Sequence, residues 1–256
     1  MKKEIVVTLD LDGTLLAHGN KIIGGQETLD LLSELDHQGA KIVINTGRLD
    51  HDIIAIQDMY DFDVNARVSQ NGCVVVDDQS IQAKLMDKTE AGLIWQELKK
   101  HPEIRTEINT VSNRYWKSLR DPDFPKEYYD SHIIKEHFQP IIEYQPVTLF
   151  LCVGQKETLE PIRDFVRANC EQVHAVMTSK TSLEIYQKGV SKGRTIKELY
   201  PDAKIYGIGD SENDFSVFDN SSVSYMIQPD GKVDATYDVS SITEALKMVK
   251  KEVENQ

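Results

Sequence analysis

Short apolar runs alternate with helical patterns along the first part of the chain. Residues 5–9 are apolar or β-branched throughout, which predicts a strand buried on both faces. Residues 41–45 repeat this pattern, and helical patterns follow the two runs at 26–38 and 49–60. A β-α-β-α order implies parallel strands joined by right-handed crossovers. The pattern therefore predicts an α/β fold with a doubly wound, Rossmann-like parallel sheet.

The same alternation returns towards the end of the chain. Residues 203–209 and 223–227 are apolar runs typical of buried strands, and residues 191–200 have a helical pattern. Ser241 and Glu244 form a capping box, which predicts the start of a last helix. These elements extend the sheet that the first part of the chain begins.

In the middle of the chain the predicted helices and strands follow a different order. This part comes after a hairpin signal, Asn71-Gly72, which lies between two short apolar runs. The elements expected after it are helices at 88–100, 126–138 and 156–169 and strands at 147–153, 173–178 and 183–186. Their order indicates a smaller α+β unit. We expect a core domain at 1–81 and 188–256, with an inserted cap domain at 82–187.

Composition excludes some classes of function. The net charge of −13 argues against broad binding of nucleic acid or anionic membranes, since both need a basic surface, but allows a local pocket for a small anion. The apolar run 5–9 is too short for a signal peptide or a membrane span, which predicts a cytoplasmic location. Cys73, Cys152 and Cys170 lack metal-type spacing and indicate free thiols. The oligomeric state stays open.

Polar side chains gather where three predicted strands end and where one helix begins. They combine carboxylates, a hydroxyl, an ammonium and a glycine turn: Asp10, Asp12, Thr46, Gly47, Arg48, Lys192, Asp210 and Asp214. In a doubly wound sheet these positions converge on one edge. Carboxylate oxygens suit Mg²⁺, which also binds substrate phosphates, and a carboxylate can act as a nucleophile on phosphorus. The pattern predicts a magnesium site for phosphate chemistry.

These residues also match a known family. Four segments resemble, in order, the four motifs of the haloacid dehalogenase superfamily: Asp10-Leu11-Asp12-Gly13-Thr14, Thr46-Gly47-Arg48, Lys192-Gly193 and Gly209-Asp210-Ser211-Glu212-Asn213-Asp214. The segments Gln70-Asn71-Gly72 and Gly189-Val190-Ser191-Lys192-Gly193 resemble the Cof-type phosphatases of that superfamily, whose α/β cap is inserted between the second and third motifs. Four ordered motifs together form a specific signal.

The resemblance implies a Mg²⁺-dependent phosphatase that hydrolyses a small phosphorylated metabolite, with sugar phosphates favoured. Asp10 would be the nucleophile that forms an aspartyl-phosphate, and Asp12 the general acid and base. The implied phosphate and substrate site comprises Leu11, Thr46, Gly47, Arg48, Lys192 and Asn213. The implied metal site comprises Asp10, Asp12 through its backbone carbonyl, Asp210, and Asp214 either directly or through water. Arg48 would contact the leaving group or fix the cap.

Other interpretations stay open at this point. A sugar phosphomutase of the same superfamily would use the same two aspartates, and a regulatory module would accept a phosphoryl group on Asp10 without turnover. The acids at 210–214 could simply cap the following helix. A basic and aromatic group in the cap is either a solvated strand face or a grip on the leaving group: Arg105, Arg114, Tyr115, Trp116, Lys117 and Arg120.

Overall fold

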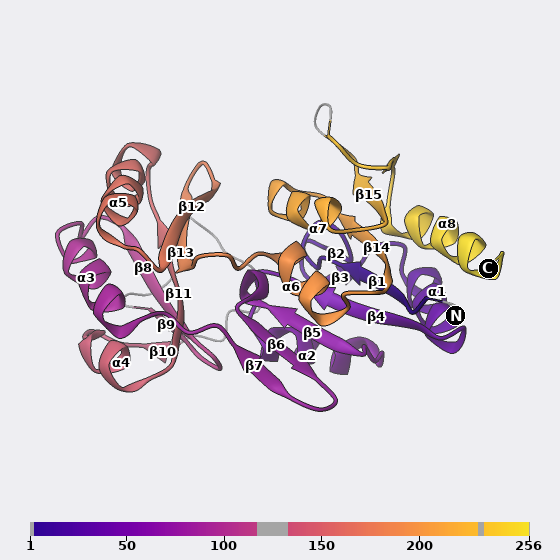
Figure 1. Ribbon diagram of the computed structural model, residues 1–256, viewed down its shortest axis with the longest axis horizontal. Helices are drawn as coiled ribbons and strands as arrows, with labels where there is room; N and C mark the ends of the chain where they lie inside the picture. Colours follow the sequence, from indigo (N-terminus) through magenta and orange to yellow (C-terminus); the bar gives the residue numbers. More distant parts are fainter. Residues whose placement is uncertain (1–2, 117–132, 230–232, 256) are drawn as a thin grey trace. The chain divides into compact units, whose positions relative to one another are not determined.

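The computed structural model describes residues 3–116, 133–229 and 233–255, and the chain forms two compact units (Figure 1). Unit 1 comprises Met1–Ile81 and Ser191–Gln256, and unit 2 comprises Gln82–Val190. The chain therefore returns to unit 1 three residues later than the predicted boundary at 188.

Unit 1 is built on an eight-stranded sheet. Its strands, in order across the sheet, are β16 (Tyr237–Val239), β15 (Val223–Ile227), β14 (Lys204–Gly209), β1 (Ile5–Leu9), β4 (Ala40–Asn45), β5 (Ala66–Ser69), β6 (Val74–Asp77) and β7 (Ile81–Ala83). Neighbouring strands from β16 to β5 run parallel. The chain fills the sheet from β1 through β4 to β5, then returns to fill the other side from β14 to β16. The order therefore reverses between β1 and β14, and such a switch point is where open α/β sheets place ligands.

Helices cover both faces of this sheet. They are α1 (Gln26–His37), α2 (Asp50–Tyr60), α6 (Lys192–Leu199), α7 (Phe215–Asp219) and α8 (Ile242–Glu254). The side chains of β1 alternate between the two faces: Val7 and Leu9 pack with α1, α2 and α8, whereas Val6 packs with α6. The hydroxyl oxygens of Thr28 and Thr243 are 2.7 Å apart, which joins α1 to α8. The doubly wound sheet is thus confirmed.

Unit 2 has its own sheet and its own core. The six strands, in order, are β10 (Ile133–Ile134), β9 (Arg114–Trp116), β8 (Arg105–Thr110), β11 (Val147–Val153), β13 (Ser182–Gln187) and β12 (Val173–Ser179). Its helices are α3 (Lys88–Leu98), α4 (Gln139–Tyr144) and α5 (Lys156–Asn169), which share one apolar core with the sheet (Figure 1). This is the α+β arrangement that the sequence predicts.

Some local predictions were wrong or incomplete. The helix expected at 126–138 is contradicted in its described part, because Ile133–Ile134 form strand β10 and α4 begins only at Gln139. The rest of that segment, together with Lys117 and Arg120, lies outside the described residues. The hairpin at Asn71-Gly72 is confirmed, since β5 and β6 pair antiparallel around it.

The six-residue strand β8 was not predicted, because five of its six residues are polar. Five strands of two or three residues were also missed: β2 (Leu16–Ala17), β3 (Lys21–Ile22), β7, β10 and β16. A segment this short has no periodicity to read, because a side-chain alternation needs about four residues to show itself.

The polar face of the sheet in unit 2 also differs from the expected solvated strand face. Arg105, Glu107, Arg114 and Trp116 are each less than 10 % exposed. The Arg105 guanidinium carbon lies 4.6 Å from the centre of the Trp116 ring, and an Arg105 nitrogen lies 3.2 Å from a Glu107 oxygen. The basic residues of β8 and β9 are therefore buried and paired.

Among the described residues, no helix combines the length and the apolar character that crossing a membrane requires.

Helices α6 and α7 approach each other so closely that only glycine fits at Gly193. A Cβ atom there would lie 1.6 Å from the backbone oxygen of Ser216. We expect Gly193→Ala to lower the free energy of unfolding by about 1–3 kcal/mol, because the two backbones must move apart. The measurement is urea unfolding. Gly92→Ala in α3, where no atom lies within 4 Å of the new Cβ, is the control and should be neutral or stabilising by about 0.5–1 kcal/mol. Equal effects of the two substitutions would contradict the prediction.

Candidate active site

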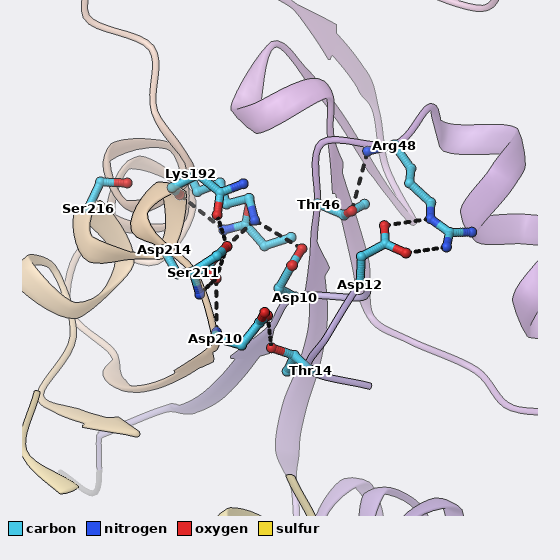
Figure 2. Close-up of polar contacts among 12 residues, drawn as sticks. Asp10, Asp12, Thr14, Thr46, Arg48, Lys192, Asp210, Ser211, Asp214 and Ser216 are labelled. Atoms are coloured by element: carbon cyan, nitrogen blue, oxygen red, sulfur yellow. Dashed lines mark hydrogen bonds and ion pairs between the residues drawn. The ribbon is translucent and has the colours of Figure 1, made fainter. Parts of the chain in front are cut away.

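A buried lysine lies between two aspartates at the switch point of the sheet (Figure 2). Asp10 follows the last residue of β1, and its backbone N–H donates to the Ile208 carbonyl of β14 at 3.2 Å. Lys192 is the first residue of α6 and is 1 % exposed. Its Nζ lies 2.9 Å from Oδ1 of Asp10 and 2.8 Å from Oδ1 of Asp214. One ammonium is thus shared by two buried carboxylates.

The charges of this cluster set the pKa of Asp10. The pKa of Asp10 is raised to about 7 in total. The main cause is burial, because the carboxylate loses its hydration there; Lys192 offsets part of this rise, and Asp214 adds to it. Burial also opposes the charge on Lys192, but Asp10 and Asp214 outweigh burial and raise the pKa of Lys192 above its usual value. The lysine therefore stays charged. Because it faces two carboxylates, the cluster keeps an excess negative charge that favours a proton or a further cation.

The loop after β14 adds two carboxylates to this position. Oδ1 of Asp210 accepts a hydrogen bond from the Thr14 hydroxyl at 2.7 Å, and burial raises the pKa of Asp210. Oδ2 of Asp214 accepts from the backbone N–H groups of Asp210 and Ser211 at 3.1 and 3.3 Å. One oxygen of Asp214 therefore caps the turn Glu212–Asp214, and the other contacts Lys192.

Three of these acids are close enough to share one ion. Single carboxylate oxygens of Asp10, Asp210 and Asp214 all lie within 4.8 Å of one another. Gly13 makes room for this arrangement, since a Cβ atom at Gly13 would lie 2.2 Å from Oδ2 of Asp210. Hard carboxylate oxygens around excess negative charge fit a small divalent cation.

The carboxylate of Asp12 takes a different direction. Asp10 faces Lys192, whereas Asp12 faces Arg48 (Figure 2). The Arg48 Nε donates to Oδ2 of Asp12 at 2.8 Å, and Nη2 donates to Oδ1. Arg48 is 6 % exposed, while the Asp12 side chain is 40 % exposed. The two acids of the first motif therefore contact different cations, Asp10 the ammonium of Lys192 and Asp12 the guanidinium of Arg48.

The remaining predicted site residues lie around this centre in different ways. The Thr46 hydroxyl is buried and accepts from the Arg48 backbone N–H at 3.3 Å. Gly47 and Asn213 are exposed, and Oδ1 of Asn213 accepts from the Ser211 hydroxyl at 2.6 Å. The side chain of Leu11 is buried in the apolar core, so only its backbone is available to a ligand.

Three residues of the site had no assigned role in the sequence analysis. Thr14 holds Asp210, and Nδ2 of Asn45 donates to the Lys192 carbonyl at 3.0 Å. Thr14 belongs to the first motif, and Asn45 ends β4 just before the second motif, so their positions were a usable signal. Asn20 accepts a hydrogen bond from Arg48 at 2.9 Å and had no sequence signal at all.

A sequence model of the family described as haloacid dehalogenase-like hydrolase matches residues 7–231. The chain belongs to this family. The resemblance noted in the sequence is therefore confirmed. The inserted unit of this haloacid dehalogenase-like hydrolase lies between the second and third motifs. No curated protein sequence matches the chain.

Solved structures have the same fold over nearly the whole chain. A haloacid dehalogenase-like hydrolase from Bacteroides thetaiotaomicron is 17 % identical with a TM-score of 0.80, over 96 % of this chain and 100 % of that one. One from B. subtilis is 20 % identical with a TM-score of 0.81, over 94 % and 98 %. A structure described as a subclass IIB sugar phosphatase of the superfamily is 16 % identical with a TM-score of 0.75, over 97 % and 99 %. At these identities the similarity shows the fold.

Gly13 allows a test of the candidate metal site formed by Asp10, Asp210 and Asp214. We expect Gly13→Ala to displace the Asp210 carboxylate and to weaken Mg²⁺ binding about tenfold or more, since one candidate ligand is lost. Isothermal titration with Mg²⁺ measures this. Gly19→Ala is a matched control, because Gly19 has a similar positive φ of 76° but no atom within 4 Å of the new Cβ. Equal loss in both variants would attribute the effect to backbone strain instead.

The raised pKa of Asp10 predicts a pH dependence of metal affinity. Below about pH 7 Asp10 holds a proton that the cation must displace, so the dissociation constant for Mg²⁺ should rise by up to about tenfold per pH unit as the pH falls. Above that pH the affinity should level off. Titrations with Mg²⁺ from about pH 5 to pH 9 measure this. A flat profile across that range would contradict the assignment of the proton to Asp10.

Proposed function

We propose that this protein is a Mg²⁺-dependent phosphatase that hydrolyses a small phosphate monoester through an aspartyl-phosphate on Asp10. The observation that carries the proposal is the buried Asp10–Lys192–Asp214 cluster, with a second acid, Asp12, two residues further on. The lysine and the nearby acids offer one positive centre for a phosphate and a place for a cation. Family membership supports hydrolysis as the class of reaction.

Two chemical steps follow from this arrangement. In the first, an oxygen of Asp10 forms a bond to phosphorus while the bond from phosphorus to the leaving oxygen breaks, and Asp12 gives that oxygen a proton. In the second, a water oxygen attacks the phosphorus, Asp12 takes the proton of the water, and the bond between phosphorus and Asp10 breaks. Inorganic phosphate leaves, and both aspartates return to their starting state.

Lys192, Thr46 and Asn213 are the proposed phosphate ligands, with backbone N–H groups near Leu11 and Gly47. Lys192 is already charged and held in place by two carboxylates, so it needs no reorganisation to meet a phosphate oxygen. The other side chains need only small movements, because the Thr46 hydroxyl accepts a weak hydrogen bond from a backbone N–H at 3.3 Å and Asn213 is exposed.

The proposed Mg²⁺ ligands are Asp10, Asp210, the backbone carbonyl of Asp12 and, directly or through water, Asp214. When bound, Mg²⁺ would offset the negative charge of the phosphate and of the acids around it. The Asp12 carboxylate is left out of this set, because Arg48 holds both of its oxygens. That separation keeps one acid for the proton while the other acts on phosphorus.

Sugar phosphates are the leading substrate class. The superfamily member described as a sugar phosphatase shares this fold, which supports the choice. We propose that the inserted unit selects the leaving group. The cytoplasmic location stays a prediction from the sequence.

The two aspartates are expected to be individually essential. Asp10→Asn removes the nucleophile and Asp12→Asn removes the proton carrier, so each should lower kcat at least about a hundredfold without unfolding the protein. Phosphate release from a panel of phosphorylated metabolites, with Mg²⁺ and with EDTA, measures this, and circular dichroism checks the fold. Asp58→Asn, an exposed acid of α2, is the control that should stay active. Near-normal turnover of either variant would overturn the mechanism.

The same assay separates the alternative functions. A phosphomutase would convert one sugar phosphate to its isomer without releasing inorganic phosphate. A regulatory module would keep a stable acyl-phosphate on Asp10 after treatment with acetyl phosphate and would not turn over. The second acid at Asp12 favours hydrolysis, because a phospho-acceptor without turnover needs no proton carrier at that position.

A further inference from the structure

The position of Asp12 depends on one arginine, and that arginine has a second polar partner. Nη2 of Arg48 donates to Asp12 and also to Oδ1 of Asn20, at 2.9 Å in the second case. A guanidinium that is bound only to a half-exposed carboxylate can move together with that carboxylate. A third contact from a different segment removes that freedom, because it fixes the plane of the guanidinium.

Asn20 is itself held firmly in the turn that joins β2 to β3. It is 2 % exposed and has a φ of 58°, a left-handed conformation that asparagine adopts more readily than most residues. The Tyr60 hydroxyl at the end of α2 donates to the Asn20 carbonyl at 2.6 Å. Tyr60, Asn20, Arg48 and Asp12 therefore form a continuous chain of hydrogen bonds.

The Asn20 side chain is kept at an energetic cost. Its Nδ2 is buried and has no hydrogen-bond partner among the described residues. A buried amide donor without a partner destabilises the folded state, and a smaller apolar residue would avoid that cost. The compensating contact is the one to Arg48, since Arg48 can only donate and so requires the oxygen of the amide to face it.

We propose that Asn20 is a positioning residue which, through Arg48, fixes the direction of the Asp12 carboxylate. This inference rests on the proposed function, in which Asp12 must meet both the leaving oxygen and the attacking water. It assigns Arg48 a role other than a contact to the leaving group. Misplacing a proton donor by a fraction of a bond length weakens general acid catalysis while leaving phosphate binding intact.

Asn20→Gly is the sharpest variant, because glycine removes the amide and accepts the same φ. The readout is kcat/KM, which covers the steps up to departure of the leaving group. For an alkyl phosphate such as glycerol 3-phosphate, which needs a proton donor, kcat/KM should fall about tenfold or more. For p-nitrophenyl phosphate, whose leaving group departs without a proton, it should fall far less. A merely structural defect would lower both values by the same factor.

Two control variants complete the kinetic test. Asn20→Asp keeps an acceptor oxygen and tolerates the same backbone angle. The ratio of its kcat/KM values for the two substrates should therefore stay close to the wild-type ratio. Asp61→Gly changes another residue with a positive φ, 52° at the end of α2, and should leave both values unchanged. An unchanged ratio in Asn20→Gly would overturn the inference.

A second measurement does not depend on activity. In ¹H–¹⁵N spectra at low temperature, the Nη2–H group of Arg48, which donates to Asn20, should give a slowly exchanging signal, assigned by its loss in Arg48→Lys. The signal should broaden or disappear in Asn20→Gly and persist in Asn20→Asp and Asp61→Gly. Its persistence in Asn20→Gly would overturn the inference. If the wild-type protein hydrolysed neither phosphate, the proposed function would fail, and the spectra would still decide whether Asn20 fixes Arg48.

Discussion

The site depends on one buried cation. The Lys192 ammonium is almost inaccessible to water and contacts Asp10 and Asp214 at the same time. Without it, two carboxylates would face each other in a place where neither has its hydration, and burial would be far more costly. With it, the acids can lie close enough for a cation to bridge them.

The packing of unit 1 serves this contact. Lys192 starts α6, and the next residue must be glycine because α6 lies against the backbone of Ser216. Asp214 lies two residues before Ser216, and its Oδ1 accepts a hydrogen bond from Lys192 Nζ at 2.8 Å. The Asn45 amide holds the Lys192 carbonyl, so the end of β4 fixes the start of α6 as well. Close approach of backbones, rather than side-chain packing alone, places the charge.

The two acids of the first motif differ because their neighbours differ. Asp10 is buried against a lysine and carries a raised pKa, whereas Asp12 is half-exposed and held by an arginine. A lysine is a compact charge that several carboxylates can share, while a guanidinium is a planar fork that orients a single carboxylate. Two residues apart in the sequence, the acids thereby acquire separate tasks in the proposed reaction.

The sequence by itself determined the central strands of the parallel sheet, most helices and the family. Runs such as Ile5–Leu9 and Val147–Val153 are long and apolar enough to show their conformation without any tertiary information. The ordered motifs also named Asp10, Lys192, Asp210 and Asp214, which the structure brings together. The three acids follow strands of a parallel sheet, where ligands bind, and Lys192 starts a helix that the third motif marks.

Only the tertiary structure decided which cation each acid contacts. Asp12 reaches Arg48 across 36 positions of sequence, and Asn20 joins them from a turn that no periodicity marks. The environment of the polar strands of unit 2 could not be predicted for the same reason. Whether Arg105 faces solvent or Glu107 depends on the residues that pack over it. The direction of a side chain is set by neighbours from distant segments, and the pattern of residues along the chain does not show which segments become neighbours.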